Sequence, residues 1–125
     1  MDIQRVVLLC RSETHEQLMI QRNYLLKIAH ENNWKVVAAI MEKRKGRYRR
    51  RFRLRLAMNL AQRHRAAIFV ADVSRLSRDP SIAVEYAKQL RSRNIKLISA
   101  KDNVKTDQVN TILQYEKLAK LASMV

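Results

Sequence analysis

Hydrophobic residues along this chain fall into short runs separated by stretches with helical spacing. Apolar runs with the length and β-branched content of buried strands lie at 5–11, 34–41, 67–71 and 95–99. Between and after these runs, apolar residues recur every three or four positions, which predicts amphipathic helices. The predicted order is therefore a strand followed by a helix, repeated four times along the chain.

Local signals mark the ends of the predicted helices. Thr14 followed by Gln17 has the spacing of a capping box, and the asparagine pair at 32–33 ends that first helix. Pro80 suits the first turn of the third helix, with Asp79 as its cap. The residues expected on the buried helix faces are Leu18, Gln21, Leu25, Ile28 and Ala29, then Leu54, Met58 and Ala61, then Ala83, Ala87 and Leu90.

A last helix is predicted near the end of the chain. Its cap is Thr106 or Asp107, and one of its sides carries Ile112, Tyr115, Leu118 and Leu121. Strands alternating with helices predict an α/β fold, with a mainly parallel sheet of four to five strands and helices on both faces. A length of 125 residues predicts a single domain over 1–125.

Composition narrows the kinds of site to expect. His15, His30 and His64 have no second ligand at a metal-binding spacing, so no metal site is expected. Gly46 is the only glycine, which excludes a glycine-rich phosphate loop and, with it, a bound nucleotide cofactor of that type. Cys10 lies inside an apolar run and is interpreted as a core residue in a reducing compartment, with a reactive thiol as the alternative.

No segment has the apolar length needed to span a bilayer, and the amino terminus lacks a signal-peptide pattern. These features predict a cytoplasmic protein. No helix with a clearly apolar membrane face is evident either, so a membrane partner is not expected.

Positive charge is the strongest compositional signal. Lysine and arginine number 26 against 11 aspartate and glutamate, which gives a formal net charge of +15. Such an excess attracts polyanions through counterion release, so a nucleic acid is the expected partner. Residues 43–55 form a basic segment, whose candidate nucleic-acid-binding residues are Lys43, Arg44, Lys45, Arg47, Arg49, Arg50, Arg53 and Arg55.

Arginine and serine follow two of the predicted strands. Arg11 and Ser12 come after the first strand, and Arg75 and Arg78 after the third. The carboxyl ends of parallel strands meet at one edge of a sheet, where ligands bind in open α/β folds. A serine surrounded by arginines suits phosphoryl transfer without a metal. The alternative is that the later two arginines only satisfy helix ends and neighbouring aspartates, at 72 or 79.

Two of these segments resemble motifs of one known family, the serine recombinases or resolvase/invertase family. Segment 11–17, Arg-Ser-Glu-Thr-His-Glu-Gln, resembles the family's Arg-Val-Ser-Thr-x-x-Gln pattern at the end of its first strand. Segment 73–78, Val-Ser-Arg-Leu-Ser-Arg, is similar to the family's Leu-Asp-Arg-Leu-Ser/Gly-Arg pattern. Weaker similarities occur in the same order as in the family, at 21–22, 33–34 and 51–54, and the resemblance covers almost the whole chain.

The resemblance implies a resolvase-like three-layer fold, DNA as the partner and site-specific recombination through a phosphoserine, with no cofactor. It implies that Arg11, Arg75 and Arg78 hold the scissile phosphate, with Arg51 as a fourth. It also implies a dimer or tetramer assembled through the C-terminal helix. Family members continue into a helix-turn-helix domain, which is not expected here after residue 125.

The nucleophile motif departs from the family pattern. Keeping Arg11 and Gln17 aligned places Glu13 at the nucleophile position and Ser12 on the family's valine, while Ser74 stands where the family has aspartate. One hypothesis is an active recombinase that uses Ser12. The other is a catalytically inactive regulator or accessory subunit that binds DNA, or RNA, through its basic segment. Enzymatic activity is left open between them.

Overall fold

The computed structural model describes residues 3–44, 51–72, 75–77 and 79–101. Its elements in chain order are β1 (Arg5–Ser12), α1 (His15–Glu31), β2 (Lys35–Lys43), α2 (Phe52–His64), β3 (Ala67–Val70), α3 (Pro80–Ser92) and β4 (Leu97–Ser99). The four strands form one parallel sheet in the order β2-β1-β3-β4, which confirms the predicted α/β fold. The helix predicted after Thr106 or Asp107 lies outside the described residues.

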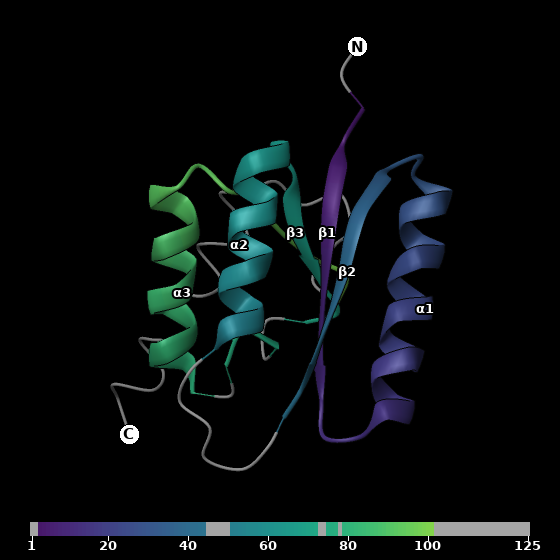
Figure 1. Cartoon of the computed structure of the whole chain (residues 1–125), viewed down its shortest axis with the longest axis horizontal. Coiled ribbons are helices and arrows are strands. Elements are labelled where there is room, and N and C mark those ends of the chain that lie inside the picture. Colours follow the sequence, from purple (N-terminus) through teal and green to yellow (C-terminus); the bar gives the residue numbers. More distant parts are fainter. Residues whose placement is uncertain (1–2, 45–50, 73–74, 78, 102–125) are drawn as a thin grey trace.

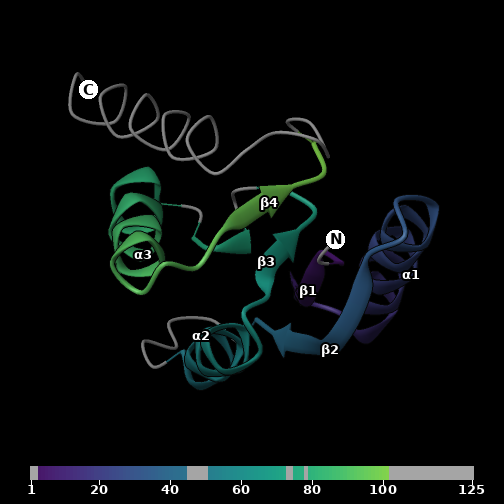
Figure 2. The same ribbon diagram turned by 90° about the horizontal axis from the view of Figure 1, so that it is seen from above.

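Helices cover both faces of the sheet, as predicted. Helix α1 lies on one face, and α2 and α3 lie on the other (Figure 1, Figure 2). The central strand β1 is buried on both sides, because Val7 and Leu9 pack toward α2 and α3 while Val6, Leu8 and Cys10 pack toward α1. This alternation explains why the strand reads as one continuous apolar run in the sequence.

The helix faces expected from the sequence are the buried ones. All five predicted residues of α1 are buried, and so are the three predicted in α2 and the three in α3. The N-caps are also confirmed: Thr14 Oγ1 accepts a hydrogen bond from the Gln17 amide at 3.2 Å, and Asp79 Oδ1 accepts one from the Ser81 amide at 2.9 Å. Each cap satisfies an amide that the helix leaves unpaired, so each helix begins at a fixed residue.

Each described helix is followed, within two residues, by a residue in the left-handed conformation that is not glycine. These residues are Asn33, Arg65 and Asn94, with φ of 58°, 52° and 57°. In each case the next amide donates to a carbonyl five residues earlier, from Trp34 to Ala29, Ala66 to Ala61 and Ile95 to Leu90, at 2.8 to 2.9 Å. This Schellman arrangement closes the helix and turns the chain into the following strand. That backbone conformation costs about 1–2 kcal/mol at arginine and less at asparagine.

Strand β2 continues two residues beyond the sequence expectation, which ended it at Met41. Glu42 pairs with Arg11 and Lys43 pairs with Ser12 in the parallel register of β1 and β2. Glu42 is buried despite its charge. The extension brings a carboxylate to the carboxyl edge of the sheet, where the arginines were expected.

Cys10 is a fully buried residue of β1, which confirms its interpretation as a core residue. Burial raises the pKa of its thiol from an ordinary 9.0 to about 11, and the positive charges of Arg22 and Arg75 oppose this shift only in part. Because the pKa is higher in the folded state, folding favours the protonated thiol. The resulting contribution to the free energy of unfolding is complete below pH 9 and is lost as the pH rises toward 11.

We expect Cys10 of the folded protein to react with a disulfide reagent about a hundred-fold more slowly at pH 8 than in denaturant. A two-unit rise in pKa lowers the reactive thiolate fraction by about that factor, and burial slows access further. Absorbance of the released thiol measures both rates. Equal rates in the folded and unfolded chains would show that the thiol is accessible and ionisable after all.

Candidate functional site

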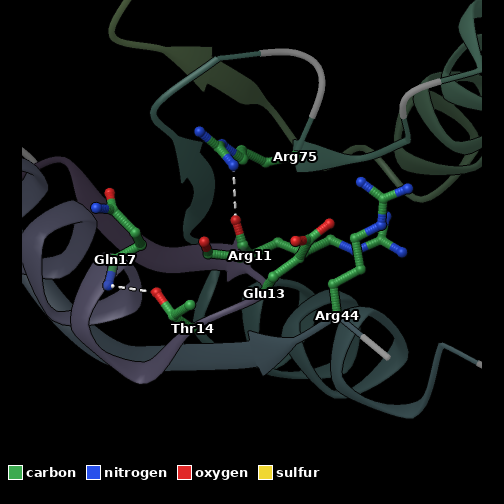
Figure 3. Close-up of a pocket in the computed structure, with 7 residues that line it drawn as sticks. Arg11, Glu13, Thr14, Gln17, Arg44 and Arg75 are labelled. Atoms are coloured by element: carbon green, nitrogen blue, oxygen red, sulfur yellow. Dashed lines mark hydrogen bonds between the residues drawn. The ribbon is translucent and has the colours of Figure 1, made fainter. Parts of the chain in front are cut away.

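A pocket of about 210 Å³ lies at the carboxyl edge of the sheet, where β1 ends (Figure 3). Its wall combines the turn from β1 into α1, the residue that follows β2, and the loop that follows β3. The lining residues are Arg11, Ser12, Glu13, Thr14, Gln17, Arg44 and Arg75. The structure therefore brings together three of the expected site residues, Arg11, Ser12 and Arg75, and adds Arg44 from the basic segment.

The backbone at Arg11 is held from two directions. Gln21 of α1 is buried, and its side chain accepts from the Arg11 amide at 3.1 Å and donates to the Arg11 carbonyl at 2.9 Å. The same carbonyl accepts a second hydrogen bond from Arg75 Nη1 at 2.8 Å (Figure 3). Helix α1 and the loop after β3 are thus tied to the backbone of one residue of β1, which fixes the position of the neighbouring Ser12.

Arg75 also pairs with an aspartate on its own loop. Its Nε lies 3.3 Å from Asp72 Oδ2, and its side chain remains about one-third exposed. The sequence offered pairing with aspartate as an alternative to a role in the site, but the structure shows both features in one side chain. Asp72 and the Arg11 carbonyl orient the guanidinium, and the pocket borders it.

Arg51 and Glu42 form a buried ion pair beside the pocket. Arg51 Nε lies 2.8 Å from one carboxylate oxygen of Glu42, and Arg51 Nη2 lies 2.5 Å from the other. The guanidinium also donates to the carbonyls of Leu76 and Arg75, the latter at 3.4 Å, and lies 5.4 Å from the ring centre of Tyr86. In this structure Arg51, expected as a fourth phosphate ligand, holds Glu42 and the loop after β3 and does not line the pocket.

Glu42 joins this pair to the pocket. Its Oε1 lies 3.6 Å from Arg11 Nε, so one carboxylate serves two guanidinium groups. Burial and the neighbouring charge of Arg51 lower the pKa of Arg11, and Glu42 opposes that effect only in part. Arginine stays protonated in proteins, so the shift means that the charged side chain is incompletely compensated where it stands. An anion in the pocket would relieve this cost.

The charges that line the pocket favour a phosphate. Among the lining residues, Arg11, Arg44 and Arg75 outnumber the one carboxylate, that of Glu13, by two charges, and Asp72 and Glu42 behind the lining compensate part of this excess. Figure 3 shows Glu13 turned toward the side chains of Arg11 and Arg44. Ser12 lines the same pocket. The site thus combines a hydroxyl with three guanidinium groups, and it also contains a carboxylate that competes with an incoming anion.

The basic segment contributes to the site through its first residues. The Arg44 amide donates to the Ser12 carbonyl at 2.7 Å. This hydrogen bond holds the residue that follows β2 beside the pocket. Lys43, Arg53 and Arg55 are exposed. Four other expected nucleic-acid ligands, Lys45, Arg47, Arg49 and Arg50, lie outside the described residues, as does Arg78.

Sequence reasoning missed the role of Glu42. A signal was present, because Glu42 is the only acidic residue between Glu31 and Asp72. A lone carboxylate directly after an apolar run, and directly before a basic segment, is a candidate for a buried ion pair. Gln21 was expected on the buried face of its helix, but its hydrogen bonds to the Arg11 backbone were not predicted.

Among the described residues, no three His, Cys, Asp or Glu side chains cluster as metal ligands would. None of the described helices has the length and apolar character of a membrane span.

Comparison with known proteins gives one family and several structural neighbours. Residues 6–124 match the family model described as "Resolvase, N terminal domain". No curated protein sequence matches significantly. The N-terminal catalytic domain of TP901-1 integrase superposes with a TM-score of 0.76 at 20% identity, covering 97% of this chain and 95% of that one.

Two further solved structures share the fold. A resolvase family site-specific recombinase from Streptococcus pneumoniae has a TM-score of 0.76 at 18% identity, covering 97% of this chain and 87% of that one. The C-terminal catalytic domain of ISC1926 TnpA, an IS607-like serine recombinase, has a TM-score of 0.66 at 19% identity, covering 88% and 75%. At such low identities these similarities concern the fold of the domain.

Proposed function

This chain belongs to the resolvase N-terminal domain family, and we propose that it binds DNA in site-specific recombination and holds a backbone phosphate in the pocket at the end of β1. The observation that carries this proposal is the convergence of Arg11, Arg44 and Arg75 around Ser12 in one pocket. Guanidinium groups bind phosphate oxygens through paired hydrogen bonds. The net charge of +15 supplies the longer-range attraction to DNA.

The pocket is prepared for a phosphate before DNA arrives. Gln21 and Arg75 fix the peptide of Arg11, and Glu42 fixes its side chain. Side chains that are already ordered lose little entropy on binding, so more of the interaction energy remains for the ligand. Arg51 acts indirectly in this proposal, because it holds Glu42 and the loop that carries Arg75.

Ser12 is the nucleophile of the proposed reaction. Its Oγ attacks the phosphorus, the bond from phosphorus to one deoxyribose oxygen breaks, and the hydroxyl proton ends on that departing oxygen. The product is a phosphoserine linkage, and the reverse reaction with a different deoxyribose hydroxyl rejoins the strand. Arg11, Arg75 and, by family resemblance, Arg78 stabilise the charge that builds on the other phosphate oxygens.

Glu13 favours a second candidate function. Its carboxylate lines the same pocket, and a carboxylate is a poor nucleophile toward a phosphodiester and repels it. A chain of this kind would bind DNA as a catalytically inactive regulator or accessory subunit. The basic segment would then provide much of the contact. In both cases assembly as a dimer or tetramer is part of the proposal, as is the choice of DNA over RNA.

Phosphate binding is tested by the salt dependence of DNA affinity. We expect the logarithm of the association constant to fall steeply with the logarithm of salt concentration, and Arg75→Ala to reduce that slope by about one. The loss should be similar on unrelated duplexes, because a phosphate contact carries no sequence information. Fluorescence anisotropy with a labelled duplex, and with RNA of the same sequence, measures these constants.

Lys27→Ala is the matched control, because it removes the same charge from an exposed position of α1. Lys27 lies twelve residues beyond the start of α1 at His15, about 18 Å along the helix from the pocket end. The control should leave the slope nearly unchanged. Salt-insensitive binding by the wild-type chain, or equal effects of the two variants, would contradict a phosphate site at Arg75.

A further inference from the structure

A second basic pocket lies at the opposite edge of the sheet, where α2 and α3 end and β3 begins. It has a volume of about 430 Å³. Three of its lining residues are cations and three carry side-chain amides, namely Arg65, Arg93, Lys96, Gln4, Gln62 and Asn94. None of the described residues that line it is acidic.

The positive charge here exceeds what the helix ends require. The carboxyl ends of α2 and α3 each present about half a negative charge, whereas the pocket carries three full positive charges. One carbonyl in the last turn of each helix is already engaged, since the Ala66 amide donates to the Ala61 carbonyl and the Ile95 amide donates to the Leu90 carbonyl. Within the described part of the chain, no carboxylate pairs with any of the three cations, and the Arg93 side chain donates to the Asn59 side chain at 3.1 Å. An excess of about two positive charges is therefore available to a ligand.

The groups that line this pocket suit a stretch of nucleic-acid backbone. Arg65 and Asn94 are exposed, and Arg93 and Lys96 are partly exposed, so a large ligand can reach them. Amide side chains add hydrogen bonds to phosphate and sugar oxygens, as in other protein–DNA contacts. The volume is about twice the 210 Å³ of the pocket at Ser12, which leaves room for more than one phosphate.

The two pockets lie at opposite edges of the sheet, because β1 runs from the edge where α2 and α3 end to the edge where α1 begins (Figure 1). Strand β1 has eight residues, so the two edges are about 26 Å apart. A duplex that lies across the carboxyl edge, with a phosphate in the Ser12 pocket, is separated from the second pocket by the length of β1. A ligand of the second pocket must come from elsewhere.

We propose that the pocket around Arg65, Arg93 and Lys96 binds the backbone of a second duplex DNA segment. This inference rests on the proposed function, since it assumes that a first duplex occupies the Ser12 pocket. A domain with both contacts holds two duplexes on opposite edges of one sheet. Because the second contact involves phosphates and no base edges are required, the second duplex is bound without sequence preference.

A capture experiment with two duplexes tests the proposal. One duplex is immobilised and saturated with the full chain, and a second, labelled duplex of unrelated sequence is then added. The double variant Arg65→Gly/Lys96→Gln is expected to bind the first duplex within two-fold of the wild-type affinity and to retain the second at least ten-fold less. Glycine adopts the left-handed conformation of residue 65 without the steric cost that arginine has. The midpoint of thermal unfolding of the Arg65→Gly variant should therefore not fall.

Asn33→Gly is the matched control, because it changes a left-handed residue at the end of α1 without removing charge. It should leave capture of the second duplex unchanged. Normal capture by the double variant would overturn the second site, as would a wild-type chain that binds the first duplex and never retains a second. Neither of those results would contradict phosphate binding at the Ser12 pocket. Absence of any DNA binding would overturn the proposed function itself.

Discussion

Replacing Glu42 with alanine is expected to lower the free energy of unfolding by about 3–5 kcal/mol, the cost of leaving a buried charge without its partner. The Arg51 side chain is 8% exposed, and both oxygens of Glu42 contact its guanidinium. In the variant, Arg51 would keep only the carbonyls of Leu76 and Arg75 and the ring of Tyr86. Arg11 would lose its only described carboxylate within 4 Å.

Urea denaturation followed by circular dichroism measures the loss. The double variant Glu42→Leu/Arg51→Met should recover most of the stability, because removing a whole buried ion pair in favour of apolar side chains is often neutral. It should not recover DNA affinity, since Arg11 and the loop of Arg75 would no longer be held in place. A loss below about 1 kcal/mol, the range of an exposed ion pair, would show that this pair is solvated.

Replacing Ser12 with alanine is expected to abolish the covalent protein–DNA linkage, with a fall in rate on the order of 10⁶ or to below detection. Removing the nucleophile of a serine enzyme has an effect of that size. Glu13 cannot take its place, because a carboxylate is a poor nucleophile toward a phosphodiester. DNA affinity should fall much less, because the guanidinium groups of Arg11, Arg44 and Arg75 remain in the pocket.

The measurement uses supercoiled DNA that carries a library of candidate sites, quenched with denaturant and analysed for a protein–DNA adduct. Peptide mapping of the adduct identifies the linked residue. Thr14→Ala is the control, because it removes a second hydroxyl from the same pocket at about 1 kcal/mol of stability for the lost cap. It should retain the adduct. A wild-type chain that binds DNA and forms no adduct at Ser12 would favour the catalytically inactive alternative.

Periodicity in the sequence determined the architecture. Continuous apolar runs identified the described strands and helical spacing of apolar residues identified the described helices, because burial on two faces gives an unbroken run and burial on one stripe gives a helical period. Leu18, Leu25 and Ile28 point inward as their spacing required. The same patterns placed Arg11 and Arg75 at one edge, because the ends of parallel strands meet there.

Only the tertiary structure decided which charges are paired. The family resemblance implies that Arg51 is a fourth phosphate ligand, but its position at the start of α2 brings it against Glu42 and the loop after β3. Such a pairing depends on the register of β1 with β2 and on where a helix begins relative to a distant loop. Neither quantity leaves a periodic trace in the sequence.

The second basic pocket also depends partly on the sequence and partly on the tertiary structure. The sequence revealed the excess of positive charge, yet Arg65, Arg93 and Lys96 are spread over thirty-two positions of the chain and belong to no basic run. They converge because α2 and α3 both end at one edge of the sheet and turn back through left-handed residues. Composition set how many cations the chain carries. The crossover connections of the fold decided which of them gather around a common ligand.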